Sequence, residues 1–497
     1  MSVRKLSAVA LAELLGTWSG RGPAYANLAS ALRQLVQDGR LPLAAHLPGE
    51  RTFAAALGVS RTTVTAAYTR LRDEGYLTTQ RGARSVTALP PGSVSPGFPA
   101  SGSAPAGLLD LAFATLPASE QVSRAYAEAL RSLSAHLPSH GYAPHGLPVL
   151  REAIAERYSR RGLATNAEQI VVTFGAQHAF SLLLRVLVSA GDRVVVDQPT
   201  YPHALDALRG ASCRVVPVAL NAEGWDVSAV RAAFRQTAPR LAYLIPDFHN
   251  PTGWCMPEPQ RAAVARAAAE SRTTLIIDET LADLALDVPV PRPFARHVRS
   301  RENAGAEVVG AEFAGAEVIS IGSLSKTFWG GLRVGWIRAK GALVDRVMGS
   351  RSTVDLGAPI LEQLTAAALL TDEMSDPTLE ARRDTLRRQR AALTQQLAKH
   401  LPDWRYPVPT GGLSFWVTLP APVSSALAAT AERHGVRVAA GSHFGSEGLF
   451  ERQLRVPFTL PETDLEEAVL RLSRAYAALG SSTPESGAAR QVGKAMA

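Results

Sequence analysis

The sequence contains little cysteine and no long apolar run. Cys213 and Cys255 are the only cysteines among 497 residues. Their small number excludes a disulfide framework or a cysteine-rich metal site, and it is typical of proteins of the reducing cytoplasm. No run of eighteen apolar residues appears, so we expect no membrane span. Residues 1–18 begin with a basic pair and an apolar stretch, but Glu13 interrupts that stretch and no small-residue cleavage site follows. An amphipathic helix is expected there rather than a signal peptide.

Acidic residues are scarce at the start of the chain. Between Met1 and Thr87, eleven Arg and Lys residues stand against five Asp and Glu residues, which accounts for most of the net charge of +8. Such a local excess favours a polyanionic partner, although a basic face can also be merely solvated. The length, with 46% hydrophobic residues, predicts two or more domains and a large core.

The rest of the chain is organised around residues 318–335. A β-branched run predicts a buried strand, which is followed by a turn rich in hydroxyl groups that contains Lys326. A lysine loses its proton near neutral pH when it is partly desolvated and flanked by cations. Ser323, Ser325 and the fork of Arg333 can hold a phosphate dianion. The pattern therefore predicts a Schiff-base lysine beside a phosphate site, and the alternative is a surface lysine after a strand.

The basic N-terminal segment has a helical pattern of its own. We expect helices over about 25–38 and 50–57, and a third helix that begins after the cap residue Ser60. A short apolar helix joined by a tight turn to a polar, basic helix predicts a helix-turn-helix, whose second helix enters the major groove of DNA. Extended pieces at 76–79 and 85–87 flank a basic glycine turn and predict a wing.

Three stretches of this segment resemble the winged helix of GntR-type bacterial regulators: Leu47-Pro48-Gly49-Glu50-Arg51, the run from Leu57 to Val64, and Glu74-Gly75-Tyr76-Leu77. Ala44-Ala45 and Gly49 depart from the usual residues, but neither change removes a side chain that reads bases. The resemblance implies a DNA-binding surface with Arg81 and Gly82 in the minor groove. Its other expected contact residues are Arg51, Ser60, Arg61, Thr62, Thr63 and Thr65.

Residues 88–107 predict a tether. Thirteen of these twenty residues are Pro, Gly or Ser, and such a segment cannot bury enough apolar surface to fold. A flexible chain of this length has an r.m.s. span of about 25 Å, so it can join domains of different subunits. We also expect a flexible loop at 289–317 and a disordered tail at 480–497. The predicted domains are 1–87 and 108–479, the latter with a small subdomain at about 345–479.

Beyond the tether, strand and helix patterns alternate, which predicts a doubly wound α/β sheet with parallel strands. Gly175, Ala176 and Gln177 follow one expected strand and open a helix, where backbone amides can hold a phosphate. Tyr201 follows the next strand and can stack on a flat ring. Asn250 follows a third strand and can donate a hydrogen bond to a phenolic oxygen.

Two charged residues complete the predicted site. Asp278 ends an apolar strand, where a buried carboxylate needs a partner such as a protonated pyridine nitrogen, and a protonated pyridine ring withdraws electrons. A helix N-cap is the alternative for Asp278. Arg455 lies late in the chain, where a small C-terminal domain can supply a guanidinium that binds a carboxylate; the alternative is an ordinary surface arginine.

These motifs, with Leu150-Arg151-Glu152-Ala153-Ile154-Ala155 and Asn250-Pro251-Thr252-Gly253, resemble class I aminotransferases. The resemblance implies an α/β fold type I domain with a small C-terminal α+β subdomain, and pyridoxal 5'-phosphate bound covalently by Lys326. A GntR winged helix joined by a linker to such a domain is the arrangement of the MocR regulators. Within these regulators, the sequence at 278–281 and 326–331 is similar to that of the YczR-like branch. Leu281 departs from the family, since aminotransferases usually place a tyrosine there. The pair Gly141-Tyr142 is also shifted relative to the usual Tyr-Gly motif.

Two functions follow from this resemblance. The first is a cytoplasmic, homodimeric transcription regulator that binds a double-stranded DNA operator and uses pyridoxal phosphate as effector or as receptor for an amino compound. The second is an active aminotransferase with an accessory DNA-binding domain. Leu281 and the complete recognition helix favour the first.

Overall fold

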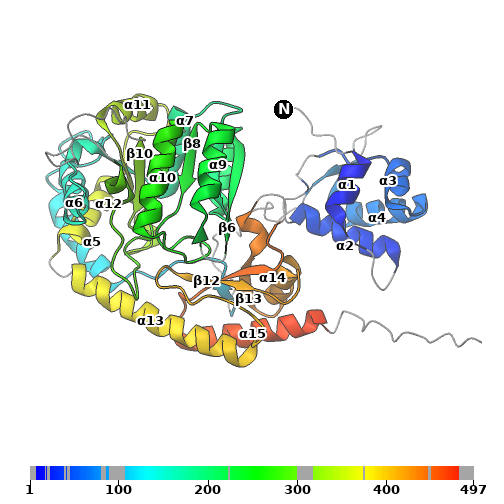
Figure 1. Ribbon diagram of the computed structural model, residues 1–497. Coiled ribbons are helices and arrows are strands. Elements are labelled where there is room, and N and C mark those ends of the chain that lie inside the picture. Colours follow the sequence, from blue (N-terminus) through cyan, green and yellow to red (C-terminus); the bar gives the residue numbers. More distant parts are fainter. Residues whose placement is uncertain are drawn as a thin grey trace, which may run out of the picture.

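The computed structural model describes residues 7–16, 18, 23–37, 41, 45–79, 85–88, 107–221, 224–298, 317–372, 375–445 and 449–480. These residues form an N-terminal unit, a large α/β unit and a smaller α+β unit (Figure 1). Within these ranges, no helix combines the length and the apolar character that crossing a membrane requires. Several predicted features lie outside the described residues. They are the wing residues Arg81 and Gly82, most of the tether, most of the loop at 289–317, and the tail from residue 481 onward.

The N-terminal unit consists of α1 (Ala8–Leu15), α2 (Ala24–Gln37), α3 (Glu50–Leu57) and α4 (Arg61–Asp73), followed by the antiparallel strands β1 (Leu77–Thr79) and β2 (Ser85–Thr87). Gly58 ends α3 with φ of 65°, a left-handed conformation that glycine adopts without strain. The Ser60 hydroxyl accepts a hydrogen bond from the Thr63 N–H at 3.1 Å and starts α4. Together these two ends produce the predicted tight turn.

The large unit is built on an eight-stranded sheet with the order β4-β11-β10-β9-β8-β5-β6-β7. Its strands are β4 (Ile170–Thr173), β5 (Arg193–Gln198), β6 (Arg214–Asn221), β7 (Gly224–Trp225), β8 (Leu241–Leu244), β9 (Thr274–Asp278), β10 (Val318–Ser323) and β11 (Gly335–Arg338). The pairs from β10 through β9, β8 and β5 to β6 are parallel, as expected. The sheet is nevertheless mixed, because β11 runs antiparallel between β10 and β4, and β7 antiparallel beside β6.

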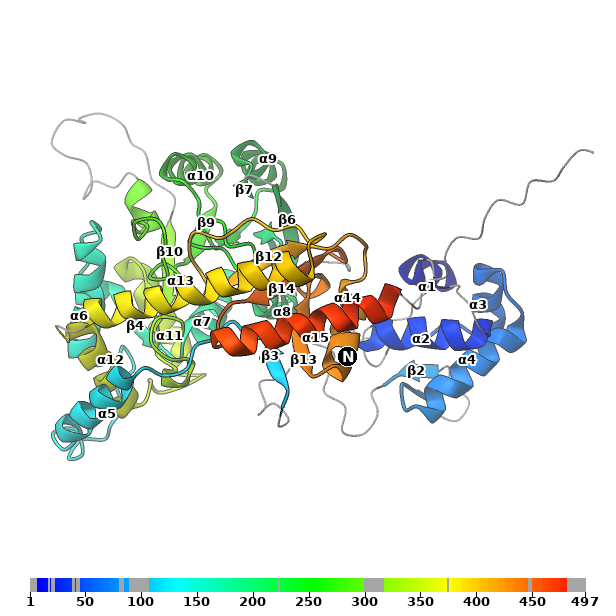
Figure 2. The same ribbon diagram turned by 90° about the horizontal axis from the view of Figure 1, so that it is seen from below.

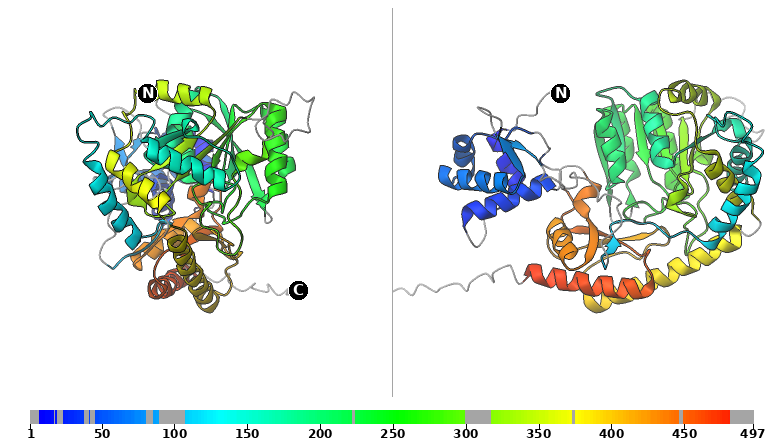
Figure 3. Two further views of the ribbon diagram at one scale, coloured as in Figure 1. Left: turned by 90° about the vertical axis from the view of Figure 1, so that its left-hand side faces the viewer. Right: turned by 180° about the vertical axis from the view of Figure 1, so that it is seen from behind.

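Helices cover both faces of this sheet (Figures 1 and 3). One face packs against α7 (Ala176–Leu187), α8 (Pro202–Gly210) and α11 (Gly341–Arg351). The other face packs against α5 (Glu120–Leu133), α6 (Pro148–Arg160), α9 (Val227–Thr237), α10 (Glu258–Ser271) and α12 (Ile360–Thr371). Short 3₁₀ turns lie at Ala167–Gln169, Phe294–His297, Gly330–Leu332 and Gly441–Phe444.

The smaller unit has a four-stranded sheet with the order β12-β14-β13-β3. It comprises β3 (Leu109–Leu111), α13 (Ser375–His400), β12 (Ser414–Thr418), α14 (Ser424–Arg433), β13 (Val436–Ala440), β14 (Gln453–Pro457) and α15 (Glu462–Gly480). The helices α13 and α15 lie side by side below the sheet (Figures 1 and 2).

The start of this unit differs from the expected position near residue 345. The apolar side chains of α11 and α12 pack against the large sheet and its helices, so both helices belong to the large unit. The first helix of the small core is instead α13. This core also includes Leu111 of the earlier strand β3, which pairs in parallel with β13.

Candidate functional site

The outer face of α4 is polar and exposed, as predicted. The Arg61 side chain is 71% exposed, and Thr62 and Thr69 are exposed beside it. Arg51 is exposed on the neighbouring α3. Two predicted contact residues also serve the helix itself, because the Ser60 hydroxyl caps α4 and lies 2.8 Å from the Thr63 hydroxyl.

Glu50 joins α3 to two predicted DNA contacts on α4. Its Oε2 accepts a hydrogen bond from the Thr65 hydroxyl at 2.8 Å and lies 3.6 Å from Nε of Arg61. Sequence reasoning noted Glu50 only as part of a family motif and assigned it no role. The available signal was its place in the first turn of the helix before the recognition helix.

Strand ends from the large sheet and residues of the small sheet line one cavity. Ten predicted residues line it: Ala176, Gln177, Tyr201, Asn250, Asp278, Ser323, Ser325, Lys326, Arg333 and Arg455. Gly175 immediately precedes the first of these. The cavity is also lined by residues that no motif indicated, among them Ala114, His203, Tyr243 and Phe248. Tyr142 is absent from the lining and is 60% exposed.

Lys326 lies in the turn after β10. Its Nζ donates a hydrogen bond to the Ala114 carbonyl at 2.8 Å. Burial lowers the pKa of the Lys326 amine to about 8, with smaller lowering contributions from the charges of Arg455 and Arg333. A sizeable fraction of this amine is therefore neutral near physiological pH, as a nucleophilic lysine requires.

One end of the cavity is suited to a phosphate. Arg333 Nη1 lies 3.5 Å from the Ser325 hydroxyl, which is 2.9 Å from the Ser323 hydroxyl. Gly175 has φ of 82° and directly precedes α7, whose first residues Ala176 and Gln177 line the cavity, so the N–H groups at the start of that helix are available to an anion there. A Cβ atom at Gly175 would lie 2.8 Å from Arg333 Nη2, so the close approach of the guanidinium to this turn requires glycine.

A buried carboxylate lies at a different point of the cavity wall. Asp278 Oδ2 accepts a hydrogen bond from the Tyr243 hydroxyl at 2.7 Å, and Oδ1 accepts one from the Thr280 N–H at 2.9 Å. Burial raises the pKa of Asp278, and these hydrogen bonds act in the opposite direction. Among the described residues that line the cavity, Asp278 is the only acid. A cationic ring nitrogen is a chemically suitable partner for it.

Arg455 enters the cavity from β14. Its Nη1 donates to Asn250 Oδ1 at 3.1 Å, and its Nη2 donates to the Ala112 carbonyl. Burial lowers the pKa of Arg455 to about 10, so the guanidinium keeps its charge at neutral pH. The bond to Oδ1 orients the Asn250 amide and leaves its NH₂ group available to donate.

Leu281 lines the same cavity, where its side chain offers no hydrogen bond. It is half-buried and packs against the core of the small unit. At position 281 the cavity wall therefore presents an apolar side chain where a tyrosine would present a hydroxyl group.

Comparison with known proteins assigns each of the two functional segments of the chain to a protein family. Residues 109–472 match the family described as aminotransferase class I and II, and residues 24–86 match the bacterial regulatory proteins of the gntR family. The chain belongs to the class I and II aminotransferase family and carries a GntR DNA-binding domain in front of the aminotransferase domain. This fusion is that of a MocR-type regulator. Proteins with this aminotransferase fold depend on pyridoxal 5'-phosphate, which is the cofactor of this domain.

The relatives include regulators and enzymes. YjiR of Escherichia coli (strain K12), an uncharacterized HTH-type transcriptional regulator, is 27% identical over 474 residues, which cover 90% of this chain and 97% of YjiR. The 2-aminoadipate transaminase of Thermus thermophilus is 30% identical over 346 residues, 69% of this chain and 81% of the enzyme. An alignment that covers 90% of this chain must include both the DNA-binding domain and the aminotransferase domain.

A solved structure shows the same fold for the aminotransferase domain. It is LysN, the α-aminoadipate aminotransferase of Thermus thermophilus, in complex with N-(5'-phosphopyridoxyl)-L-leucine. It matches with a TM-score of 0.67 and 29% identity over 76% of this chain and 94% of LysN.

Proposed function

We propose that the protein regulates transcription in the cytoplasm by binding operator DNA through α3 and α4 and sensing, in the cavity around Lys326, pyridoxal phosphate or an amino compound. The observation that carries the proposal is the combination in one chain of an exposed recognition helix and a cofactor cavity with leucine at position 281. A cofactor site with fewer hydrogen-bond donors can bind its ligand yet turn over slowly. A regulator needs only a change of ligand state that favours one arrangement of its domains.

The cavity residues fit pyridoxal phosphate, because separate parts of the wall match its anionic and cationic ends. When bound, the cofactor supplies an aldehyde that reacts with amines and a ring that withdraws electrons. Lys326 supplies the amine for covalent attachment, and Asp278 keeps a proton on the ring nitrogen. Tyr201 would stack on the ring, and Asn250 would donate to its phenolic oxygen. Two groups of residues would bind anions. Arg333, Ser323 and Ser325 would bind the phosphate, and Arg455 would bind the carboxylate of an amino acid.

An active aminotransferase is the second candidate function. Its supporting observation is that every predicted cofactor residue except Gly175 lines one cavity. A coupled assay of steady turnover with pairs of amino acids and keto acids separates the two functions. The regulator proposal expects operator affinity to change with the cofactor or an amino compound while steady turnover stays low. Unchanged operator affinity across all ligand states would contradict it.

Arg61→Ala is expected to weaken specific operator binding by roughly 1–3 kcal/mol, about fivefold to 150-fold, because the guanidinium would no longer read a base edge. The measurement is a DNA-binding titration on operator and unrelated DNA at one salt concentration. Arg131→Ala is a matched control, since it also removes one positive charge and its side chain is 70% exposed, on α5 of the large unit. Equal effects of the two variants would argue against the placement of Arg61 in the groove.

A homodimer is expected, and exposed apolar side chains favour one surface for it. Leu137, Tyr142 and Leu356 are exposed by 71%, 60% and 51%. The loops that carry the last two touch, because a Cβ atom on Gly357 would lie 2.5 Å from the Ala143 carbonyl oxygen. We propose the exposed apolar side chains on these touching loops as the contact surface between subunits, because contiguous apolar surface marks interaction sites.

Sedimentation of the protein with its cofactor at micromolar concentration is expected to give twice the chain mass. Leu356→Asp should shift it toward the monomer, because it places a charge in the apolar patch. Val408→Asp is the control, since Val408 is also exposed, by 52%, on a different loop. A wild-type monomer under these conditions would exclude the dimer, and equal responses of the two variants would exclude this surface.

A further inference from the structure

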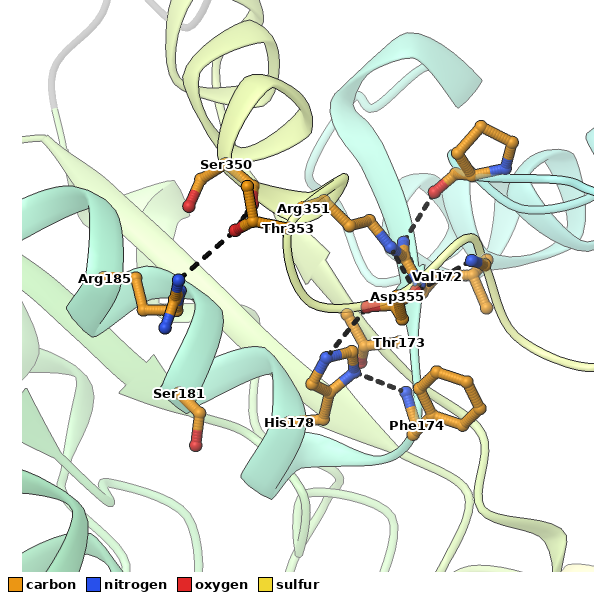
Figure 4. Close-up of polar contacts among 12 residues, drawn as sticks. Val172, Thr173, Phe174, His178, Ser181, Arg185, Ser350, Arg351, Thr353 and Asp355 are labelled. Atoms are coloured by element: carbon orange, nitrogen blue, oxygen red, sulfur yellow. Dashed lines mark hydrogen bonds and ion pairs between the residues drawn. The ribbon is translucent and has the colours of Figure 1, made fainter.

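His178 lies in the first turn of α7, directly behind the turn that forms the phosphate end of the cavity. Its Nδ1 accepts a hydrogen bond from the Phe174 N–H at 3.1 Å, and its Nε2 lies 3.2 Å from Asp355 Oδ2 (Figure 4). Because Nδ1 is the acceptor, the ring proton must sit on Nε2, where it faces the carboxylate. The contacts therefore select one tautomer of the neutral imidazole. His178 does not line the cavity itself.

Asp355 is held in place by a buried arginine. Its Oδ1 accepts hydrogen bonds from Arg351 Nε and from the Gly357 N–H, each at 2.8 Å. Arg351 is 1% exposed, and its Nη1 donates to the carbonyl oxygens of Val172 and Pro144, each at 2.6 Å. Figure 4 shows the Arg351 side chain reaching toward both Val172 and Asp355.

These contacts form a closed path around the turn. Val172 precedes the turn on β4 and is bound by Arg351, while His178 follows the turn on α7 and is bound by Asp355. The Phe174 N–H then joins His178 to the turn itself. The Phe174 carbonyl accepts from Arg333 Nη2 at 3.0 Å, so one peptide segment carries both the His178 contact and the phosphate-site arginine. The path thus fixes the orientation of the amides that follow Gly175.

We propose that His178 is a positioning residue for the phosphate-binding turn, and that uptake of a proton by His178 weakens the binding of pyridoxal phosphate. The inference deepens the proposed function and rests on the cofactor site described there. A protonated imidazole donates from both nitrogens. Nδ1 would then carry a proton that faces the Phe174 N–H, so this hydrogen bond would be lost and the turn would lose one of the contacts that position it.

The charges around the ring set the pH range of this effect. Burial lowers the pKa of His178, Asp355 raises it, and Arg351 lowers it, with a net shift below the ordinary value. The neutral form, which the folded turn requires, is therefore favoured by folding. Its stabilising contribution is complete above the ordinary histidine pKa of about 6.5 and is lost as pH falls through the lowered pKa of the folded protein.

The test compares cofactor affinity as a function of pH in the full-length wild type, His178→Asn and His178→Leu. An asparagine side-chain oxygen can accept from the Phe174 N–H and does not titrate, whereas leucine removes the acceptor. As pH falls from about 7.5 through the ordinary histidine pKa of about 6.5 and into the acidic range below it, where the lowered pKa of His178 lies, wild-type affinity should fall more steeply than that of His178→Asn. The phosphate of the ligand also titrates near pH 6, but it does so equally for all variants. At about pH 7.5, His178→Leu should bind roughly tenfold more weakly, as expected for a buried N–H without an acceptor.

Two controls make the result specific to the phosphate turn. Pyridoxal without phosphate should bind all three proteins with similar affinity. His297→Asn should follow the wild-type profile, because His297 also has a lowered pKa but lies in the 3₁₀ turn at Phe294–His297. Parallel pH profiles for wild type and His178→Asn would overturn the proposal, as would unchanged affinity in His178→Leu. Wild type that binds no pyridoxal phosphate at any pH would instead overturn the proposed cofactor site as well.

Discussion

Lys326→Ala is expected to abolish covalent attachment of pyridoxal phosphate. Lys326 is the only lysine among the described residues that line the cavity, and the whole chain contains five lysines. The visible absorbance band that borohydride bleaches should disappear, and the mass added by borohydride reduction should be lost. In wild type, the rate of attachment should rise with pH through about 8, because the Lys326 pKa is lowered to about 8 and only the neutral amine attacks.

Lys340→Ala is the control for this experiment. Lys340 is the next lysine along the chain, and it is exposed at the start of α11 outside the cavity. This variant should keep the full reducible band and the mass increment. A Lys326→Ala protein that still incorporates one cofactor per chain on reduction would show that another amine is the attachment site.

Leu281→Tyr is expected to raise transamination by about tenfold to a hundredfold. A phenol there can donate to the negative phenolic oxygen of the bound cofactor, and leucine leaves Asn250 as the main donor among the predicted residues. One charge-assisted hydrogen bond is worth roughly 1.5–3 kcal/mol, which corresponds to this change in rate if the bond is formed in the transition state. The measurement compares both proteins with one panel of amino acids and keto acids.

Leu281→Met separates the hydrogen bond from a change of shape, since it nearly conserves side-chain volume and adds no donor. It should transaminate as slowly as wild type. Wild-type turnover at rates typical of metabolic enzymes, about 1–1000 per second, would contradict the regulator interpretation of this site.

Local signals predicted the parts of the structure that local chemistry determines. The cap at Ser60 and the left-handed Gly58 define the turn between α3 and α4, and both belong to the sequence of that turn. Asp278 and Lys326 were singled out because each follows an apolar strand, with a helix N-cap and a surface lysine as the alternatives, and the structure places both side chains in one cavity. The parallel arrangement of the central strands then places these two ends at the same edge of the sheet.

Contacts between distant segments left no such signal. The hydrogen bond between Tyr243 and Asp278 joins neighbouring strands. A tyrosine in an apolar strand gives no sequence signal of which residue its hydroxyl will contact. The two members of the pair His178 and Asp355 lie far apart in the sequence. The pairing of β3 with β13 joins residues near 110 to residues near 437, which is why the limits of the small unit could not be read from composition.

That pairing decides where the DNA-binding unit is attached. The last residue of the tether is Gly107, whose carbonyl accepts a hydrogen bond from Arg471 on α15 at 2.7 Å, and β3 begins two residues later. The tether therefore ends on the same sheet that carries Arg455, although in sequence it leads into the large unit. If Arg455 binds a carboxylate, as we propose, a rotation of that sheet would displace the point at which the chain from the DNA-binding unit is attached. Such a displacement would be passed along the chain to the DNA-binding unit, because residues 88–107 join that unit to this sheet.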